Sequence, residues 1–93
     1  MNPLEQIRKH KAELANDYHV ARLGVFGSVA RGEATITSDV DILVEFTEDV
    51  DIFQFIKLQQ YLSDLLGKKV DLVTPAALKP MIKDKIIREV RYI

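Results

Sequence analysis

Apolar residues in the first part of the chain repeat with the period of a helix. They lie three, seven and four residues apart and form one stripe along a helix face: Leu4, Ile7, Leu14 and Tyr18. Asn2 can cap this helix with Pro3 as its first residue, and Glu5 stands where a capping-box side chain reaches back to the cap amide. We therefore predict one half-buried helix that begins at Pro3 and ends near Asp17.

Three later stretches are rich in β-branched residues and read as strands. They cover 20–26, 39–46 and 69–73. Gly24 inside the first stretch indicates that another part of the chain approaches its backbone closely. In the second stretch the side chains alternate, so Asp39 and Asp41 project from one face while the other face is apolar.

Two more helices and a short tail complete the pattern. A broad apolar face stopped by Gly67 predicts a helix over 52–66, and Pro80 starts another that runs through Ile87 after a turn at 74–78. The tail from 90 to 93 is either an edge strand or the frayed end of that helix. With a single helical turn capped by Ser28 after the first strand, the order is α-β-α-β-α-β-α, which indicates an α/β sandwich around a small sheet.

Length and composition favour a single domain over residues 1–93, because a chain of 93 residues rarely divides into two cores. An apolar content of 47% is ordinary for a globular protein, and no apolar run approaches the roughly 18 residues that span a bilayer. The N-terminus lacks the features of a signal peptide, and the absence of cysteine excludes disulfides and thiolate metal sites. We therefore expect a cytoplasmic protein without a membrane association.

The charge balance favours a small or protein partner over a nucleic acid. A net charge of −1 and a pI near 6.1 provide no global positive field for a long polyanion. Basic residues do gather near the C-terminus, but a solvated helix face is their ordinary explanation. A free nucleotide or a protein is the expected partner.

The two aspartates at the start of the second strand are the strongest chemical signal. Carboxylates two apart on a strand can bind one divalent cation or bridge a pair, and hard oxygen ligands select Mg²⁺ or Mn²⁺ over zinc. If Asp71 on a neighbouring strand faces the same side, three carboxylates converge with Asp39 and Asp41, and their repulsion calls for a cation. For an isolated Asp-x-Asp the commoner explanation is aspartates that face water.

The turn after the first strand is a candidate phosphate site. Gly27 and Ser28 can present backbone N–H groups and a hydroxyl to phosphate oxygens, although a tight turn with a serine cap is the commoner reading of such a pair. Arg31 either pairs with a phosphate or forms a structural ion pair with Glu33 or Asp39.

In combination these residues resemble a known family. Gly27-Ser28, ten intervening residues, Asp39-x-Asp41 and a downstream Asp71 in an apolar strand resemble the DNA polymerase β-type nucleotidyltransferases. The stretches that carry a closer similarity, to the minimal nucleotidyltransferase (MNT) group, are 27–33, 38–44 and 69–73.

The resemblance implies both a fold and a reaction. The fold is α/β (α+β), a mixed sheet of three or four strands with helices mainly on one side. Asp39 and Asp41 would hold two Mg²⁺ ions on the triphosphate of ATP, and Asp71 would complete the metal site and accept the proton of the attacking hydroxyl. Gly27 and Ser28 would hold the β and γ phosphates, with Arg31 beside them.

The resemblance also implies a partner. Members of the MNT group usually accompany a HEPN-domain toxin and act as its antitoxin, and in studied cases they transfer AMP to a tyrosine of the toxin. Two alternatives stay open. The chain could neutralise a toxin by binding alone, or it could transfer a nucleotide to a small molecule or an RNA end.

Overall fold

The computed structural model describes residues 2–35 and 38–93. Its helices are α1 (Pro3–Arg8), α2 (Lys11–Tyr18), α3 (Ile52–Leu66) and α4 (Pro80–Glu89), with a short 3-10 helix η1 (Pro75–Ala77) before α4. Its strands are β1 (Val20–Phe26), β2 (Val40–Phe46), β3 (Val70–Val73) and β4 (Arg91–Tyr92).

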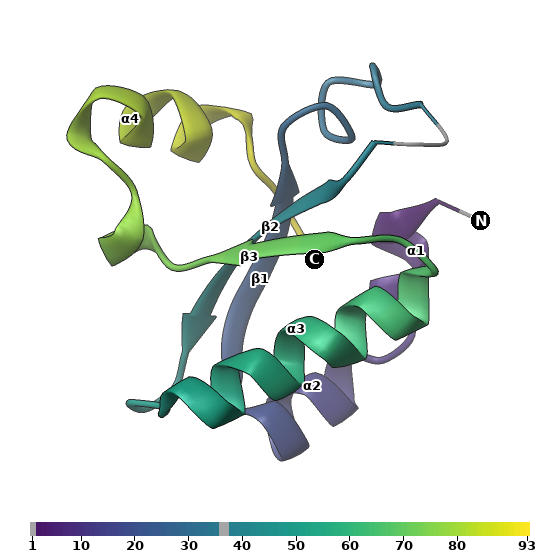
Figure 1. Ribbon diagram of the computed structural model, residues 1–93, viewed down its shortest axis with the longest axis vertical. Helices are drawn as coiled ribbons and strands as arrows, with labels where there is room; N and C mark the ends of the chain where they lie inside the picture. Colours follow the sequence, from purple (N-terminus) through teal and green to yellow (C-terminus); the bar gives the residue numbers. More distant parts are fainter. Residues whose placement is uncertain (1, 36–37) are drawn as a thin grey trace.

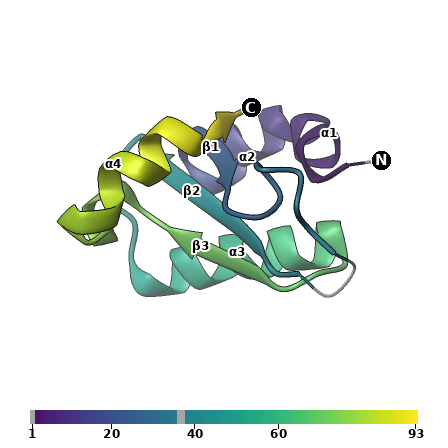
Figure 2. The same ribbon diagram turned by 90° about the horizontal axis from the view of Figure 1, so that it is seen from above.

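One mixed sheet organises these elements, in the strand order β3-β2-β1-β4. β1 is antiparallel to both β2 and β4, whereas β2 and β3 are parallel and joined through α3. Helices α1, α2 and α3 form a layer against the sheet, and α4 stands away from that layer in both views (Figures 1 and 2). The predicted α/β fold with a mixed sheet is therefore confirmed.

The core lies between the sheet and the layer of α1, α2 and α3. One face of β2 contributes three fully buried side chains: Val40, Ile42 and Val44. The helices cover them with four others that are at most 2% exposed: Ile7, Leu14, Leu58 and Leu62. Because side chains of a strand alternate between faces, burying these residues turns Asp41 to the opposite face.

The predicted single helix over 3–17 is wrong, because the chain forms two helices there. At His10 the backbone leaves the helical region (φ −109°, ψ 18°), and its N–H donates to the Ile7 carbonyl oxygen at 2.9 Å. Lys11 occupies the missing position of the apolar stripe, so no buried side chain holds the middle of the segment. The cap by Asn2 is confirmed, since its side chain accepts from the Glu5 N–H at 2.9 Å.

The segment after β1 forms a hydrogen-bonded turn within a loop and not the expected turn of helix. The predicted element order is therefore also wrong. The Arg31 N–H donates to the Gly27 carbonyl oxygen at 3.1 Å, which closes one turn that does not continue as a helix. The order is α-α-β-β-α-β-α-β with η1 before the last helix. Ile36 and Thr37, in the connection between β1 and β2, lie outside the described residues.

The other predicted elements are confirmed. The strand over 20–26 and the helix over 52–66 have the expected bounds, and the strand expected over 39–46 begins one residue later, at Val40. Gly67 ends α3 in the left-handed conformation (φ 63°), and Asp51 with Gln54 forms a capping box at its start. The tail is an edge strand. Among residues 2–35 and 38–93, no helix is long and apolar enough to cross a membrane.

Gly24 is the point where β4 approaches β1, as the sequence indicated. A Cβ at this position would lie 2.6 Å from Val90 Cγ2 and 3.0 Å from the Arg91 carbonyl oxygen. We predict that Gly24→Ala lowers the free energy of unfolding by about 1–3 kcal/mol through overpacking. Urea denaturation measures this loss.

Hydrogen exchange locates the same effect. The Ile93 N–H donates to the Leu23 carbonyl oxygen at 2.9 Å, and its exchange is expected to accelerate in Gly24→Ala. Gly67→Ala is the matched control, because a Cβ there meets no atom within 4 Å although the position is left-handed. Equal acceleration at Ile93 in both variants would contradict a local packing effect.

Candidate active site

Two carboxylates meet on neighbouring parallel strands. Asp41 of β2 and Asp71 of β3 are partners in the register, so their side chains leave the same face of the sheet. Asp39 directly precedes β2, and the adjacent backbone bond runs from the Val40 N–H to the Lys69 carbonyl oxygen at 2.9 Å. The structure thus brings together the three aspartates that the sequence singled out. The catalytic and metal-binding roles of these aspartates stay predictions.

The electrostatics of Asp41 reflect this grouping. Burial raises the pKa of its carboxyl above the ordinary value, and repulsion from Asp71 and then Asp39 raises it further. The positive charge of Arg31 opposes the rise, and the negative charge of Glu89 adds to it. Asp41 therefore sits in a negative environment that its nearby cation does not neutralise.

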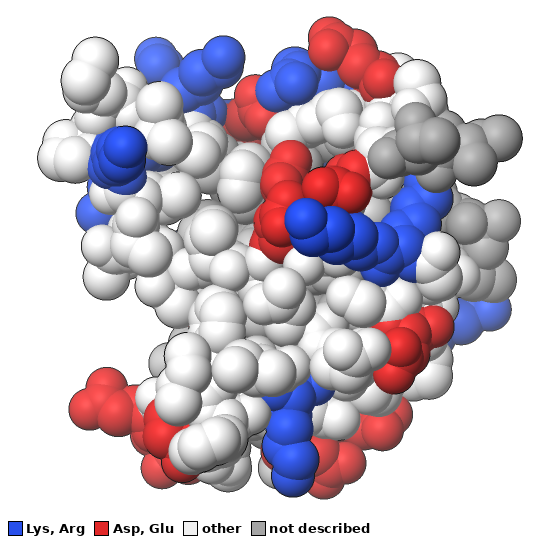
Figure 3. Space-filling view, in the orientation of Figure 1, with Lys and Arg blue, Asp and Glu red and all other residues white. Residues whose placement is uncertain are grey.

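Basic side chains lie against this acidic group. Figure 3 shows acidic and basic side chains in contact on the face that carries β2 and β3. Lys69 Nζ lies 3.9 Å from Asp39 Oδ2, and both side chains are exposed. Exposed pairs of this length contribute little to stability, so Lys69 is free to separate from Asp39 when another cation approaches.

The turn that follows β1 closes directly onto Asp41. Gly27 is left-handed (φ 73°), and a Cβ at this position would overlap the Asp41 carboxylate. Any side chain would therefore both strain the turn and push Asp41 aside. Ser28 is half-buried and lines the same hollow as Gly27, Arg31 and Asp41, a space of about 340 Å³ next to α4. A hollow of this size accommodates a polar ligand such as a phosphate group.

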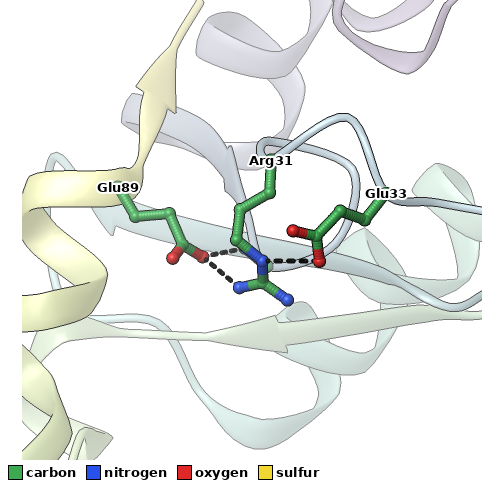
Figure 4. Close-up of polar contacts among 4 residues, drawn as sticks. Arg31, Glu33 and Glu89 are labelled. Atoms are coloured by element: carbon green, nitrogen blue, oxygen red, sulfur yellow. Dashed lines mark hydrogen bonds and ion pairs between the residues drawn. The ribbon is translucent and has the colours of Figure 1, made fainter.

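The carboxylate of Glu89, a residue that no sequence pattern singled out, lies against this turn. Its Oε1 accepts from the Gly27 N–H at 2.6 Å and from Arg31 Nη1 at 3.0 Å. Arg31 also donates through Nε to Glu33 Oε2 at 3.2 Å, so its guanidinium lies between two carboxylates (Figure 4). The sequence left two roles open for Arg31, a phosphate contact and a structural ion pair. The structure contains the ion pair with Glu33 and adds Glu89 as a second partner.

The hard-oxygen donors suit a divalent cation by their chemistry. Such an ion would reduce the repulsion from Asp71 and Asp39 that raises the pKa of Asp41. In the conformation of residues 2–35 and 38–93, however, no three His, Cys, Asp or Glu side chains are arranged to hold a metal ion. Metal binding by these residues stays a prediction.

A family model places the chain. The model described as a nucleotidyltransferase domain matches residues 7–93. The chain belongs to the nucleotidyltransferase family. This agrees with the resemblance drawn from Gly27, Ser28 and the three aspartates, and it identifies the chain as an enzyme of that class.

Relatives of this nucleotidyltransferase align over nearly their whole length. Protein adenylyltransferase MntA of Thermococcus cleftensis is 47% identical over 97 residues, covering 100% of this chain and 98% of the relative. A protein of Methanocaldococcus jannaschii, provisionally named a protein adenylyltransferase, is 51% identical over 88 residues, covering 94% of this chain and 90% of its own. A solved structure provisionally described as a minimal nucleotidyltransferase is 35% identical with a TM-score of 0.79, covering 98% and 95% of the two chains.

More distant solved structures share the fold of this nucleotidyltransferase. One is a toxin–antitoxin complex with AMP-PNP, at 24% identity and a TM-score of 0.75, covering 99% of this chain and 72% of the other. Another contains a tri-AMPylated HEPN toxin of Shewanella oneidensis with its MNT antitoxin, at 21% identity and a TM-score of 0.67, covering 97% and 70%.

The raised pKa of Asp41 predicts how stability depends on pH. A carboxyl whose pKa is higher in the folded than in the unfolded state favours folding below the ordinary carboxyl pKa, and that contribution is lost as the pH rises through the folded-state pKa. At pH 7, Asp41→Asn is therefore expected to raise the Tm, because the substitution removes a partly buried charge that is repelled by Asp71 and Asp39. The gain should shrink toward a pH of about 3, where wild-type Asp41 is protonated.

Thermal unfolding at neutral and acidic pH measures this difference. Glu45→Gln is the matched control, because Glu45 lies on the same face of β2 but forms an ion pair with Arg22 at 2.7 Å. The control should gain no stability at neutral pH. A lower Tm for Asp41→Asn than for wild type at pH 7 would contradict the repulsion.

Proposed function

We propose that the chain transfers AMP from ATP to a hydroxyl of a partner HEPN-domain toxin, expected to be a tyrosine, and thereby acts as its antitoxin in the cytoplasm. The observation that carries this proposal is the pairing of Asp41 with Asp71 on one face, with the Gly27 turn closed against Asp41. The name of the Thermococcus relative and the content of the toxin–antitoxin complexes support the acceptor and partner.

Each residue has a distinct part in this reaction. The Gly27 amide, the Ser28 hydroxyl and Arg31 bind the phosphates that leave as pyrophosphate, through N–H and O–H donors and positive charge. Asp71 accepts the proton of the attacking hydroxyl. The new bond joins the acceptor oxygen to the α-phosphorus, while the bond from that phosphorus to the bridging oxygen of the β-phosphate breaks.

Asp39, Asp41 and Asp71 would hold Mg²⁺, with two ions expected and Mn²⁺ as a substitute. The bound ions would stabilise negative charge on the phosphoryl and leaving groups. The negative environment of Asp41 supports this assignment, because a cation would reduce the repulsion there. Removal of divalent cations with EDTA should stop AMP transfer, and added Mg²⁺ should restore it.

Loss of the proton acceptor is the sharpest test of the reaction. Asp71→Asn is expected to lower the rate of AMP transfer about 10²–10⁴-fold, as is usual for removal of a general base. The assay incubates the chain with ATP, Mg²⁺ and the HEPN protein encoded beside it, and intact mass spectrometry follows the added AMP. Glu45→Gln, a carboxylate change on the same strand face, should transfer at the wild-type rate.

The same assay contains the outcome that would reject the proposal. No AMP adduct on the HEPN protein under any nucleotide or metal condition would exclude protein adenylylation. Asp39→Asn with Asp41→Asn then separates catalysis from neutralisation by binding alone. If this variant still forms the complex but no longer neutralises the toxin, binding alone is excluded.

A further inference from the structure

The Glu89 carboxylate accepts hydrogen bonds from the same donors that an anionic ligand of this site would need. The Gly27 N–H and Arg31 Nη1 both donate to one oxygen of its carboxylate, at 2.6 and 3.0 Å. The Glu89 side chain is only 15% exposed, so this carboxylate is a built part of the site. A backbone amide in a left-handed glycine turn beside a guanidinium is a typical receptor for a phosphate oxygen.

The hydrogen bonds from Gly27 and Arg31 hold the Glu89 carboxylate at a position that is otherwise unfavourable for a negative charge. Glu89 is the last residue of α4, where a negative charge opposes the helix dipole. Its charge also raises the pKa of Asp41, so it adds to the repulsion in the acidic group. The favourable partners of this carboxylate are the Gly27 amide and Arg31.

Helix α4 has few other attachments to the molecule. It contains no buried residue, and three of its apolar side chains, Met81, Ile82 and Ile87, are 95%, 46% and 43% exposed, while Ile86 is half-buried. At its C-terminal end, the two residues of β4 pair with β1. The Glu89 contacts are therefore a major polar link between α4 and the loop that follows β1.

We infer that the Glu89 carboxylate takes the place of a phosphate group in the free protein. A bound triphosphate would displace this carboxylate and thereby detach α4 from the Gly27 turn. This inference rests on the proposed function, because it assigns the Gly27 turn to the phosphates. A phosphate oxygen and the Glu89 carboxylate cannot accept from the same Gly27 N–H at the same time. Binding of the triphosphate and attachment of α4 are thus coupled, and each weakens the other.

Removal of Glu89 tests this competition directly. The probe is inorganic tripolyphosphate with Mg²⁺, measured by titration calorimetry, so that neither the base nor an acceptor protein enters the result. Glu89→Ala is expected to bind the probe about tenfold more tightly than wild type, the size expected from a hydrogen bond to a charged group. Glu89→Gln keeps an acceptor oxygen without the charge and should give a smaller gain.

Glu33→Ala is the matched control. Glu33 also accepts from Arg31, through Nε at 3.2 Å, but its side chain is 65% exposed. Its loss removes the same charge from the same arginine without freeing the Gly27 amide, so affinity should change much less than in Glu89→Ala. An equal gain in both variants would overturn the inference, because general charge would then explain it.

Hydrogen exchange supplies a second readout in the wild-type chain. Tripolyphosphate should accelerate amide exchange over residues 80–90, in contrast to the slowing that ligands usually cause. In Glu89→Ala that segment should already exchange fast, and the probe should add little. Slower exchange of this segment on binding, or unchanged or weaker affinity in Glu89→Ala, would overturn the inference.

The results separate the two proposals. If wild type transfers AMP to the HEPN protein but Glu89→Ala shows no gain in affinity, the internal anion fails and the proposed function stands. If Glu89→Ala binds tripolyphosphate more tightly while no adduct forms, the competition stands and the acceptor assignment fails. If no variant binds tripolyphosphate, the inference is overturned.

Discussion

The parallel register of β2 and β3 is the constraint on which the candidate site depends. Their pairing sets Asp41 beside Asp71, and the alternation of side chains sends both away from the core. On the core side, Val40 and Ile42 are fully buried, which fixes the register because a one-residue slip would exchange the two faces. Burial of apolar residues on one face therefore positions the carboxylates on the other.

The site combines more negative than positive charge. The charges of Asp39, Asp71 and Glu89 all raise the pKa of Asp41, and the basic side chains Arg31, Lys69 and Lys85 lie nearby. Such an arrangement reduces folding stability and suits a ligand that brings its own cations, a common compromise at functional sites. Two weakly held parts of the molecule lie next to the place where such a ligand would bind. They are the exposed ion pair of Lys69 with Asp39 and the lightly packed helix α4.

The sequence predicted those features that depend on local pattern. The content of β-branched and aromatic residues predicted β1, alternation predicted β2, and the apolar run before Gly67 predicted α3, because each signal lies within the element itself. Strand periodicity placed Asp39 and Asp41 on one face, but it left open whether Asp71 faces the same side, which the register of β2 with β3 decides. The parts predicted from local pattern include the central strands of the sheet and the pair of Asp39 and Asp41.

Other features depend on contacts between distant residues. The break at His10 lies in a segment whose helical stripe continues past it, so periodicity alone did not detect it. Glu89 reaches Gly27 across 62 residues, and no local rule connects them. The one signal in the sequence was a glutamate near a helix C-terminus, where a negative charge is usually disfavoured.

The α3 crossover also bears on the order in which the molecule folds. β1 and β2 are antiparallel and consecutive, so their pairing closes a shorter loop than the parallel pairing of β2 with β3 across α3. We expect the turn at Gly27 to meet Asp41 early and Asp71 to join later, because pairings of longer range form more slowly. The two carboxylates would then come together only after β1 and β2 have paired, when the apolar faces that hold them are already being buried.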